Sequence, residues 1–120
     1  MPWDVEVTDE FANWFASSAD ADQDAVDFTV DLLIAQGPKL RFPHSSGVAG
    51  SRHGHMRELR VQSEGRPLRV FYAFDPRRSA ILLIAGDKTG DDRFYPRLIP
   101  IADTLYDIYL DELRQEGLIK

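Results

Sequence analysis

The sequence has no cysteine and no long run of apolar residues. Without cysteine it cannot have a disulfide framework, a thiol nucleophile or a zinc–thiolate site, and it suits a reducing compartment. No apolar run approaches the roughly 18 residues of a membrane-spanning helix, and the acidic N-terminus lacks the apolar core of a signal peptide. P-loop, dinucleotide-binding and G-x-S-x-G motifs are also missing. We therefore expect a cytoplasmic protein that does not associate with membranes.

The whole chain has a formal net charge of −6, and basic residues are missing from its first third. Residues 1–37 contain nine acidic residues and no Lys or Arg, whereas residues 38–78 contain nine basic and three acidic ones. The remainder is acidic again. A basic centre between acidic ends is the field expected of a local anion-binding site. Two acidic helix faces would produce the same distribution, so charge alone leaves both interpretations open.

The centre of the chain predicts three consecutive strands. With 120 residues, 43% of them hydrophobic, the default is one domain over residues 1–120. Met56–Val61, Leu68–Phe74 and the wholly apolar Ala80–Ala85 read as strands separated by short turns. Gly65 favours the first turn because glycine adopts positive φ at little cost. Neighbouring strands with such short connections predict an antiparallel arrangement.

The flanking segments predict one more strand and three helices. Trp3–Val7 alternates as a short strand, and Thr8 is a plausible N-cap for a first helix. A second helix is expected from about Asp20 to Gln36, a loop over Lys39–His55, and a last helix over Ile99–Glu116. The predicted apolar positions of the second helix are Ala21, Ala25, Phe28, Leu32 and Ala35, with Val26, Val30 and Leu33 beside them. Those of the last helix are Ile101, Leu105, Ile108 or Tyr109, and Leu113. The order β-α-α-β-β-β-α, with strands and helices segregated, is typical of an α+β fold.

Three arginines occupy strand positions where Val, Thr or Tyr is usual. They are Arg57, Arg60 and Arg69. A strand arginine that faces water is explained by solubility alone. Three on adjacent strands also offer a planar platform for phosphate, because guanidinium groups bind phosphate through paired hydrogen bonds.

These segments resemble the RelE/HigB toxins, in particular their phage-derived HigB-like branch. The resemblance is carried by ELR at Glu58–Arg60, LRVFYAFDPRRSAILL at Leu68–Leu83, GDKTG at Gly86–Gly90 and RFYP before the last helix. The order of elements matches as well. The resemblance implies a small, curved, mainly antiparallel sheet, with two N-terminal helices on one face and a C-terminal helix. The other face of the sheet would meet RNA.

The resemblance also implies an activity and partners. The family members cleave mRNA in the ribosomal A site without metal or cofactor: the 2′-OH of the substrate attacks the adjacent phosphate and the 5′-oxygen leaves. A neighbouring gene encodes an antitoxin, often a helix-turn-helix protein. The expected partners are therefore this antitoxin, the ribosome and mRNA, in a toxin–antitoxin hetero-oligomer.

Carried over by position, the resemblance assigns roles to individual residues. Arg69 falls at the strand arginine that contacts the phosphate, Lys88 near the developing charge, and Tyr95 (or Phe94) at a C-terminal tyrosine that stacks or donates a proton. Arg60 completes the predicted catalytic set. The remaining predicted RNA contacts are Arg57, Arg93, His55 and Arg52. Open alternatives are a solvent-facing Arg69, a core-packed Tyr95, and an Arg60 paired with Glu58.

The sequence also departs from the family pattern. Asp91 and Asp92 stand where relatives carry basic residues, and Glu58 stands where the classical toxins are commonly basic. Glu58 is either the proton acceptor or an ion-paired strand residue, so the general base is not identified. A catalytically weak protein that mainly binds its antitoxin is the alternative function. A third is a small-ligand module with a pocket lined by Phe71, Tyr72 and Ile84.

All three histidines fall in one loop. His53 and His55 have a spacing seen in metal sites, and His44 or Asp92 would supply a third ligand. In a Gly/Ser-rich loop we favour mobile surface histidines and expect no metal. A proton-transfer role in an RNA site stays open, because the loop leads directly into the first arginine-bearing strand.

Overall fold

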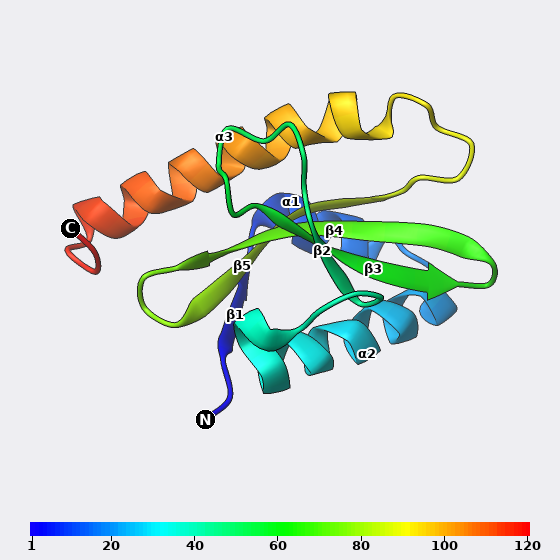
Figure 1. Ribbon diagram of the computed structural model, residues 1–120, viewed down its shortest axis with the longest axis horizontal. Helices are drawn as coiled ribbons and strands as arrows, with labels where there is room; N and C mark the ends of the chain where they lie inside the picture. Colours follow the sequence, from blue (N-terminus) through cyan, green and yellow to red (C-terminus); the bar gives the residue numbers. More distant parts are fainter.

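The computed structural model describes residues 1–120 as one five-stranded sheet flanked by helices (Figure 1). In chain order the elements are β1 (Asp4–Val7), α1 (Asp9–Ala16), α2 (Asp20–Gln36), the 3₁₀ turn η1 (Gly37–Lys39), β2 (Ser45–Gly47), β3 (Arg57–Ser63), β4 (Arg66–Asp75), β5 (Ser79–Asp87) and α3 (Phe94–Gln115). The predicted α+β class is confirmed. None of the helices has the length and apolarity that crossing a membrane requires.

The sheet has the strand order β1-β5-β4-β3-β2 and is mainly antiparallel. Only β1 runs parallel to its neighbour, β5. The β3–β4 hairpin turns at Glu64 and Gly65, whose φ angles are 51° and 78°. Two successive positive φ values suit the right-handed twist of a hairpin, which is why glycine stands there. The predicted loop Lys39–His55 is corrected in one respect, because it contains the edge strand β2.

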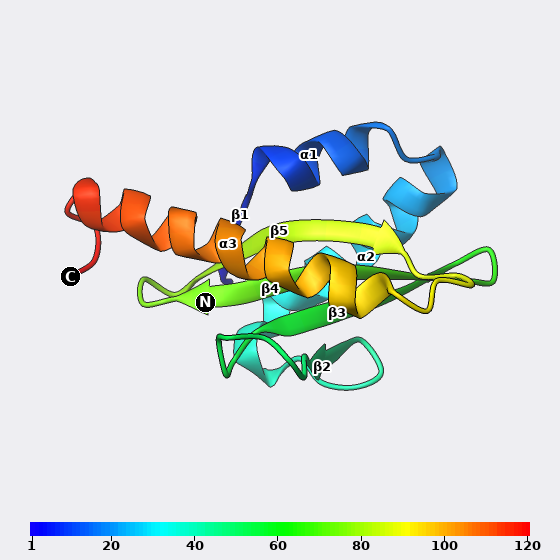
Figure 2. The same ribbon diagram turned by 90° about the horizontal axis from the view of Figure 1, so that it is seen from above.

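The sheet separates two hydrophobic cores. One lies under α1 and α2 and the other under α3, and Figures 1 and 2 show α3 on the opposite side of the sheet from α2. Successive residues of β4 point into different cores: Phe71 packs with α3, and Tyr72 packs with α1 and α2. At Leu83 and Ile84, β5 has an irregularity in register that places both side chains toward α3.

The predicted core faces of two helices are only partly right: Ala25, Leu32, Leu105, Tyr109 and Leu113 pack on the cores, as do Val26, Val30 and Leu33, and the other predicted residues are exposed. In α2 the buried residues are Asp22, Val26, Thr29 and Leu33, whereas Phe28 is 54% exposed. In α3 the side chains of Ile101 and Ile108 are exposed. There the buried residues are Phe94, Leu98, Ile99, Ala102, Asp103, Tyr106 and Leu113. Each helix has apolar residues on several sides, so a second stripe at helical spacing was available and tertiary packing selected it.

A buried carboxylate of α2 ties this helix to the β3–β4 hairpin. Asp22 accepts hydrogen bonds from Arg66 Nη2 (2.5 Å) and from Ser63 Oγ (2.6 Å). At the far end of the sheet, Asp75 accepts from Tyr109 OH (2.5 Å) and from Arg77 Nη2 (3.1 Å). The two clusters lie at opposite ends of the sheet, outside the site described below.

We expect these clusters to make the protein sensitive to acid. The Arg66 hydrogen bond, followed by that of Ser63, holds the pKa of Asp22 below its ordinary value. Burial alone would raise the pKa of Asp75, but Tyr109 and Arg77 outweigh it and the pKa is lowered. Carboxylates with lowered pKa bind fewer protons when folded. Their stabilisation is therefore complete above about pH 4 and is lost as the pH falls below it.

Urea unfolding midpoints between about pH 7 and pH 2 measure this dependence. The midpoint should fall mainly below about pH 4. Asp22→Asn should lower the midpoint at neutral pH and flatten the acid limb. An unchanged slope in that variant would contradict the role of Asp22.

Gly37 closes α2 against the N-terminal strand. Its φ is +55°, and an added Cβ would lie 2.2 Å from Nε1 of Trp3. We expect Gly37→Ala to lower the free energy of unfolding by about 3 kcal/mol, combining backbone strain with overpacking. Gly65→Ala is the matched control: its φ is also positive and no atom lies within 4 Å of the added Cβ. It should cost about 1 kcal/mol. Equal thermal unfolding shifts in the two variants would rule out the Trp3 contact.

Candidate functional site

The most enclosed charged cluster lies on the α3 face of β3 and β4. Arg60 and Arg69 stand directly opposite each other on the two strands. Glu58 serves both: its carboxylate oxygens lie 3.8 Å from Arg69 Nε and 3.8 Å from Arg60 Nη1. The side chains of Glu58 and Arg69 are only 6% and 4% exposed. One buried carboxylate thus balances two arginines whose charges would otherwise repel across the strands.

Two hydroxyl groups complete the surroundings of Glu58. Ser46, on β2, donates from Oγ to Oε2 at 3.0 Å, and Tyr95, in the first turn of α3, donates from its OH to Oε1 at 2.8 Å. Burial, together with the adjacent carboxylate, raises the pKa of Tyr95. The phenol therefore stays protonated at neutral pH and remains a hydrogen-bond donor. α3 begins at Phe94 rather than near Ile99, and this correction places Tyr95 above the strands.

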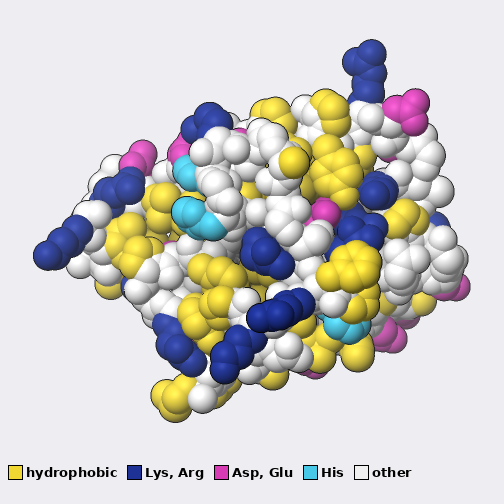
Figure 3. Space-filling view, in the orientation of Figure 1, with side chains coloured by type: hydrophobic (Ala, Val, Ile, Leu, Met, Phe, Trp, Pro, Cys, Tyr) yellow, Lys and Arg dark blue, Asp and Glu magenta, His cyan; other side chains and the backbone are white.

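Lys88 and Arg60 border the open side of the cluster. Lys88 Nζ lies 5.2 Å from the centre of the Tyr95 ring, and the Arg60 guanidinium lies 4.9 Å from the centre of the Phe42 ring. Both cations are partly exposed and both are held against aromatic faces. Figure 3 shows Lys and Arg side chains distributed over this side of the molecule, with few acidic side chains among them.

The Arg69 guanidinium is held in place by one hydrogen bond, but one of its buried donors has no acceptor. Its Nη1 donates to the carbonyl oxygen of Leu68 at 3.0 Å, whereas its Nε is buried without a hydrogen-bond partner. A buried donor without an acceptor is uncommon in proteins and calls for an explanation. The alternative of a solvent-facing Arg69 is wrong, because the side chain lies beneath Tyr95 and beside Glu58.

The predicted platform of three arginines is also wrong. Arg57 stands three residues before Arg60, and odd spacing along a strand places side chains on opposite faces of the sheet. Arg57 Nε donates to Ser45 Oγ at 3.0 Å, and Ser45 is hydrogen-bonded to Tyr72 OH in the other core. The phosphate platform is therefore limited to Arg60 and Arg69, with Lys88 beside them.

The last part of the predicted histidine loop, residues 52–55, lies along α3, away from the cluster, whereas the His44 ring lies 6.4 Å from that of Phe28 on α2. Arg52 Nη2 donates to Asp107 at 2.7 Å, and His53 Nε2 lies 2.8 Å from the same carboxylate. The ring of exposed His55 is 6.5 Å from that of Tyr106. Tyr106 follows Tyr95 by eleven residues, or about 16 Å along a helix. The structure thus places Arg52 and His55 on one side of Tyr95 and does not bring them to Glu58.

The acidic segment before α3 contains Asp91 and Asp92, of which only Asp91 is paired, with Arg97 of α3. Asp91 pairs with Arg97 and also accepts a hydrogen bond from the Arg93 backbone N–H at 3.0 Å. These contacts lower the pKa of Asp91, with the Arg97 hydrogen bond as the largest cause. The Arg93 side chain is exposed at the entrance to α3, and Asp92 is exposed beside it. Only one of the two acidic residues has an internal counter-charge.

Two hollows meet at Tyr95. The smaller, of about 350 Å³, is lined by Gly47, Val48, Ala49, Glu58 and Tyr95, and therefore opens onto the cluster. The ligand pocket predicted around Phe71 and Tyr72 is absent from the described hollows, since these fully buried residues belong to different cores. No group of three or more His, Asp or Glu side chains is placed to hold a metal ion.

Sequence reasoning missed two parts of this site. Ser46 reaches Glu58 only because β2 pairs with β3, and Phe42 reaches Arg60 from an irregular segment. Neither lies in a motif. The central position of Glu58 was available from parity, because Glu58, Arg60 and the facing Arg69 share one face of a predicted hairpin.

Comparison with known proteins agrees with this architecture. Residues 13–107 match the family described as Phage derived protein Gp49-like. The candidate toxin HigB2 of Mycobacterium tuberculosis is 42% identical over 83 residues, which are 68% of this chain and 41% of that protein. The candidate toxin HigB3 of the same organism is 44% identical over 91 residues, 75% of this chain and 77% of HigB3.

Among solved structures, a mutant of the E. coli toxin RelE in the free state matches with a TM-score of 0.58. The match covers 77% of this chain and 90% of RelE at 8% sequence identity. At that identity the likeness concerns the fold, and it confirms the predicted RelE-like sheet with its helices. The chain therefore belongs to the Gp49-like family of RelE/HigB-type toxins.

Proposed function

We propose that this protein is the toxin of a type II toxin–antitoxin pair and acts as a metal-free, ribosome-dependent mRNA endoribonuclease. The observation that carries the proposal is the cluster of Arg69, Arg60 and Lys88 around Glu58 and Tyr95. It joins fixed positive charge, a carboxylate and a protonated phenol in one place. These are the groups that cleavage by a 2′-OH requires.

In the proposed reaction the 2′-oxygen bonds to phosphorus as the bond to the 5′-oxygen breaks. Glu58 accepts the proton of the 2′-OH. Arg69 and Arg60 balance the charge that develops on the phosphate oxygens, with Arg69 Nε free to donate one more hydrogen bond. Tyr95 or Lys88 supplies a proton to the departing 5′-oxygen. The products are a 2′,3′-cyclic phosphate and a 5′-hydroxyl.

Access to Arg69 requires one movement. The guanidinium is buried, and the Tyr95 OH is hydrogen-bonded to Glu58 above it. We infer that the phosphate first meets the partly exposed Arg60 and Lys88. Rotation of Tyr95 away from Glu58 would then expose Arg69 and turn the phenol toward the RNA, where the ring can stack on a base.

The proposed partners follow from this function. An antitoxin encoded by the adjacent gene, of helix-turn-helix type, would hold the toxin inactive in a hetero-oligomer. The ribosome would present the mRNA in an extended, single-stranded form, which suits a shallow site on a sheet better than a duplex does.

Induced expression of the wild-type chain is the direct test. We expect growth arrest, and purified protein should cut mRNA on programmed ribosomes but leave free mRNA largely intact. Mapped ends should carry a 2′,3′-cyclic phosphate and a 5′-hydroxyl. Absence of both arrest and cleavage in folded protein would refute the nuclease.

A second candidate is a toxin-fold protein that has little catalytic activity and acts by binding its antitoxin. The observation that favours it is the burial of Arg69, whose positive charge is already balanced by the carboxylate of Glu58. It predicts a stable complex with the product of the adjacent gene and no RNA cleavage at any protein concentration.

A further inference from the structure

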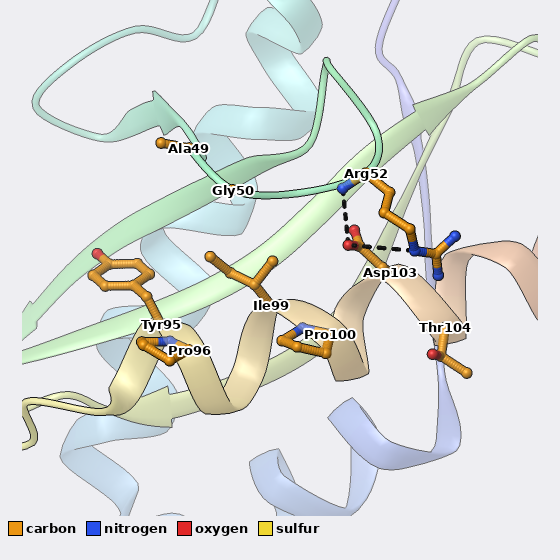
Figure 4. Close-up of a pocket in the computed structure, with 9 residues that line it drawn as sticks. All are labelled: Ala49, Gly50, Arg52, Tyr95, Pro96, Ile99, Pro100, Asp103 and Thr104. Carbon is orange, nitrogen blue, oxygen red and sulfur yellow. Dashed lines mark hydrogen bonds and ion pairs between the residues drawn. The ribbon is translucent and has the colours of Figure 1, made fainter.

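The edge strand β1 has a hollow on each face of the sheet. The hollow of about 590 Å³ beside Tyr95 (Figure 4) adjoins the proposed site near β2, which is the opposite edge of the sheet. Away from that site, a hollow of about 390 Å³ lies between β1 and α3, and one of about 280 Å³ lies between β1, α1 and α2. Val7 lines both, so the two hollows adjoin each other at β1.

Part of the outer edge of β1 is open. β1 is the last strand on its side of the sheet, so one edge of its backbone has no partner strand. The Thr8 N–H donates to the Leu82 carbonyl of β5 at 3.1 Å, and because successive residues of a strand alternate, the Val7 N–H points away from β5. The Trp3 N–H donates to the Ile34 carbonyl of α2 at 2.8 Å. This contact closes the N-terminal end of the edge and leaves its C-terminal half available.

The hollow toward α1 and α2 suits an apolar side chain. Its only charged lining residue is Asp27, and apolar side chains come from β1 and from both helices, among them Val5, Val7, Phe11, Phe15 and Val30. The Val7 side chain is 49% exposed, although it lies beside this core. An apolar side chain placed here from outside would cover apolar surface that this chain leaves in water.

The hollow toward α3 has an apolar floor and an acidic rim. Ile81 and Leu105 are part of the floor, and the rim consists of Glu6, Asp9, Glu10 and Glu112, without any Lys or Arg. Glu6 already accepts hydrogen bonds from Arg77 Nη2 at 2.6 Å and from Tyr109 OH at 2.8 Å. The other three acidic residues are exposed. Charges on an edge strand discourage unwanted pairing, but these three lie outside β1, so edge protection does not account for them.

We propose that β1 receives an extended segment of a partner protein, which adds one more strand to the sheet. Side chains of an added strand alternate between the two faces. One series would enter the apolar hollow beside Val7, and the other would meet the acidic rim. The partner segment would therefore alternate apolar residues with Lys or Arg, since basic side chains complement the rim. This surface lies away from the cluster around Glu58, so its use does not depend on RNA cleavage.

The probe is a short labelled peptide that alternates lysine and leucine, titrated against the full chain by fluorescence anisotropy. The control peptides are one that alternates glutamate and leucine and one in which all lysines precede all leucines. In the protein, Glu10→Lys combined with Glu112→Lys reverses the rim, and Ala12→Phe fills the apolar hollow. Asp24→Lys and Ala16→Phe are the matched controls, because both residues are exposed helix residues that line neither hollow. Circular dichroism first shows that each variant is folded.

The alternating lysine peptide should bind more tightly than either control peptide, and its binding should slow amide hydrogen exchange at Val7. The reversed rim and Ala12→Phe should each weaken binding by about tenfold, whereas the matched controls should bind like the wild type. Equal binding of the peptide with grouped lysines, or unchanged exchange at Val7, would indicate attraction by charge alone and overturn the added strand. An alternating lysine peptide that does not bind would overturn it as well. Cleavage is measured separately, so failure here leaves the proposed nuclease intact.

Discussion

Arg69→Ala is expected to remove growth arrest and to lower mRNA cleavage by about 10²–10³-fold, the loss typical of removing one preorganised charge donor. Arg69 is the most rigidly held cation of the cluster, since its Nη1 is fixed on the Leu68 carbonyl and its side chain is buried. A buried guanidinium needs little reorganisation when charge develops on the phosphate. Arg60 and Lys88 are partly exposed, and their removal should cost less.

The measurement is cleavage of a single mRNA on purified ribosomes under single-turnover conditions. Arg114→Ala is the matched control, because Arg114 is half exposed and pairs only with Asp111. Arg69→Gln separates charge from packing: it keeps a polar side chain that is longer than alanine but uncharged, and should be as inactive as Arg69→Ala. If Arg69→Gln cleaves at the wild-type rate while folded, the guanidinium is not on the phosphate, and the antitoxin-binding candidate is favoured.

The order of elements was readable from the sequence because local signals agree with the final structure. Thr8 caps α1 by accepting from the Phe11 N–H at 3.0 Å, as its position before the acidic first turn predicted. Glu64 and Gly65 mark the hairpin, and Gly37 ends α2. Caps and turns depend on a few neighbouring residues, so one sequence is enough to place them.

The core faces were harder, because they depend on partners distant in sequence. Phe28 is the largest apolar residue of α2 and yet is exposed, while Asp22 is buried by its contacts with Ser63 and Arg66. Propensity and periodicity assign a buried position to phenylalanine and an exposed one to aspartate. Only the β3–β4 hairpin, brought against α2 by the fold, reverses that order.

The site shows the same division. The resemblance to the RelE/HigB toxins assigned roles at the RNA to Arg69, Lys88 and Tyr95, and the structure brings these three residues together around Glu58. What sequence could not supply was the burial of Arg69. It depends on α3 beginning at Phe94 and on the edge strand β2, and neither follows from a local motif.

Glu58→Gln is expected to have the largest effect on stability, lowering the free energy of unfolding by about 3 kcal/mol. The amide oxygen can accept from one of the Tyr95 and Ser46 hydroxyls and the amide NH₂ can donate to the other, so the change removes the charge and keeps both positions hydrogen-bonded. Arg60 and Arg69 would then face each other across the strands without a counter-charge. Arg69 cannot escape to water, whereas the partly exposed Arg60 can move outward. The cost therefore depends mainly on Arg69.

A double-mutant cycle isolates that interaction. Arg69→Gln alone should cost less than Glu58→Gln, because Glu58 keeps Arg60, Tyr95 and Ser46 as partners. In the double variant no buried charge is left unbalanced. Its free energy of unfolding, measured in urea, should therefore fall by about 2 kcal/mol less than the sum of the two single-variant losses. Additive losses would mean that Glu58 and Arg69 do not interact. The carboxylate would then be available for the 2′-OH without any link to the arginine beneath it.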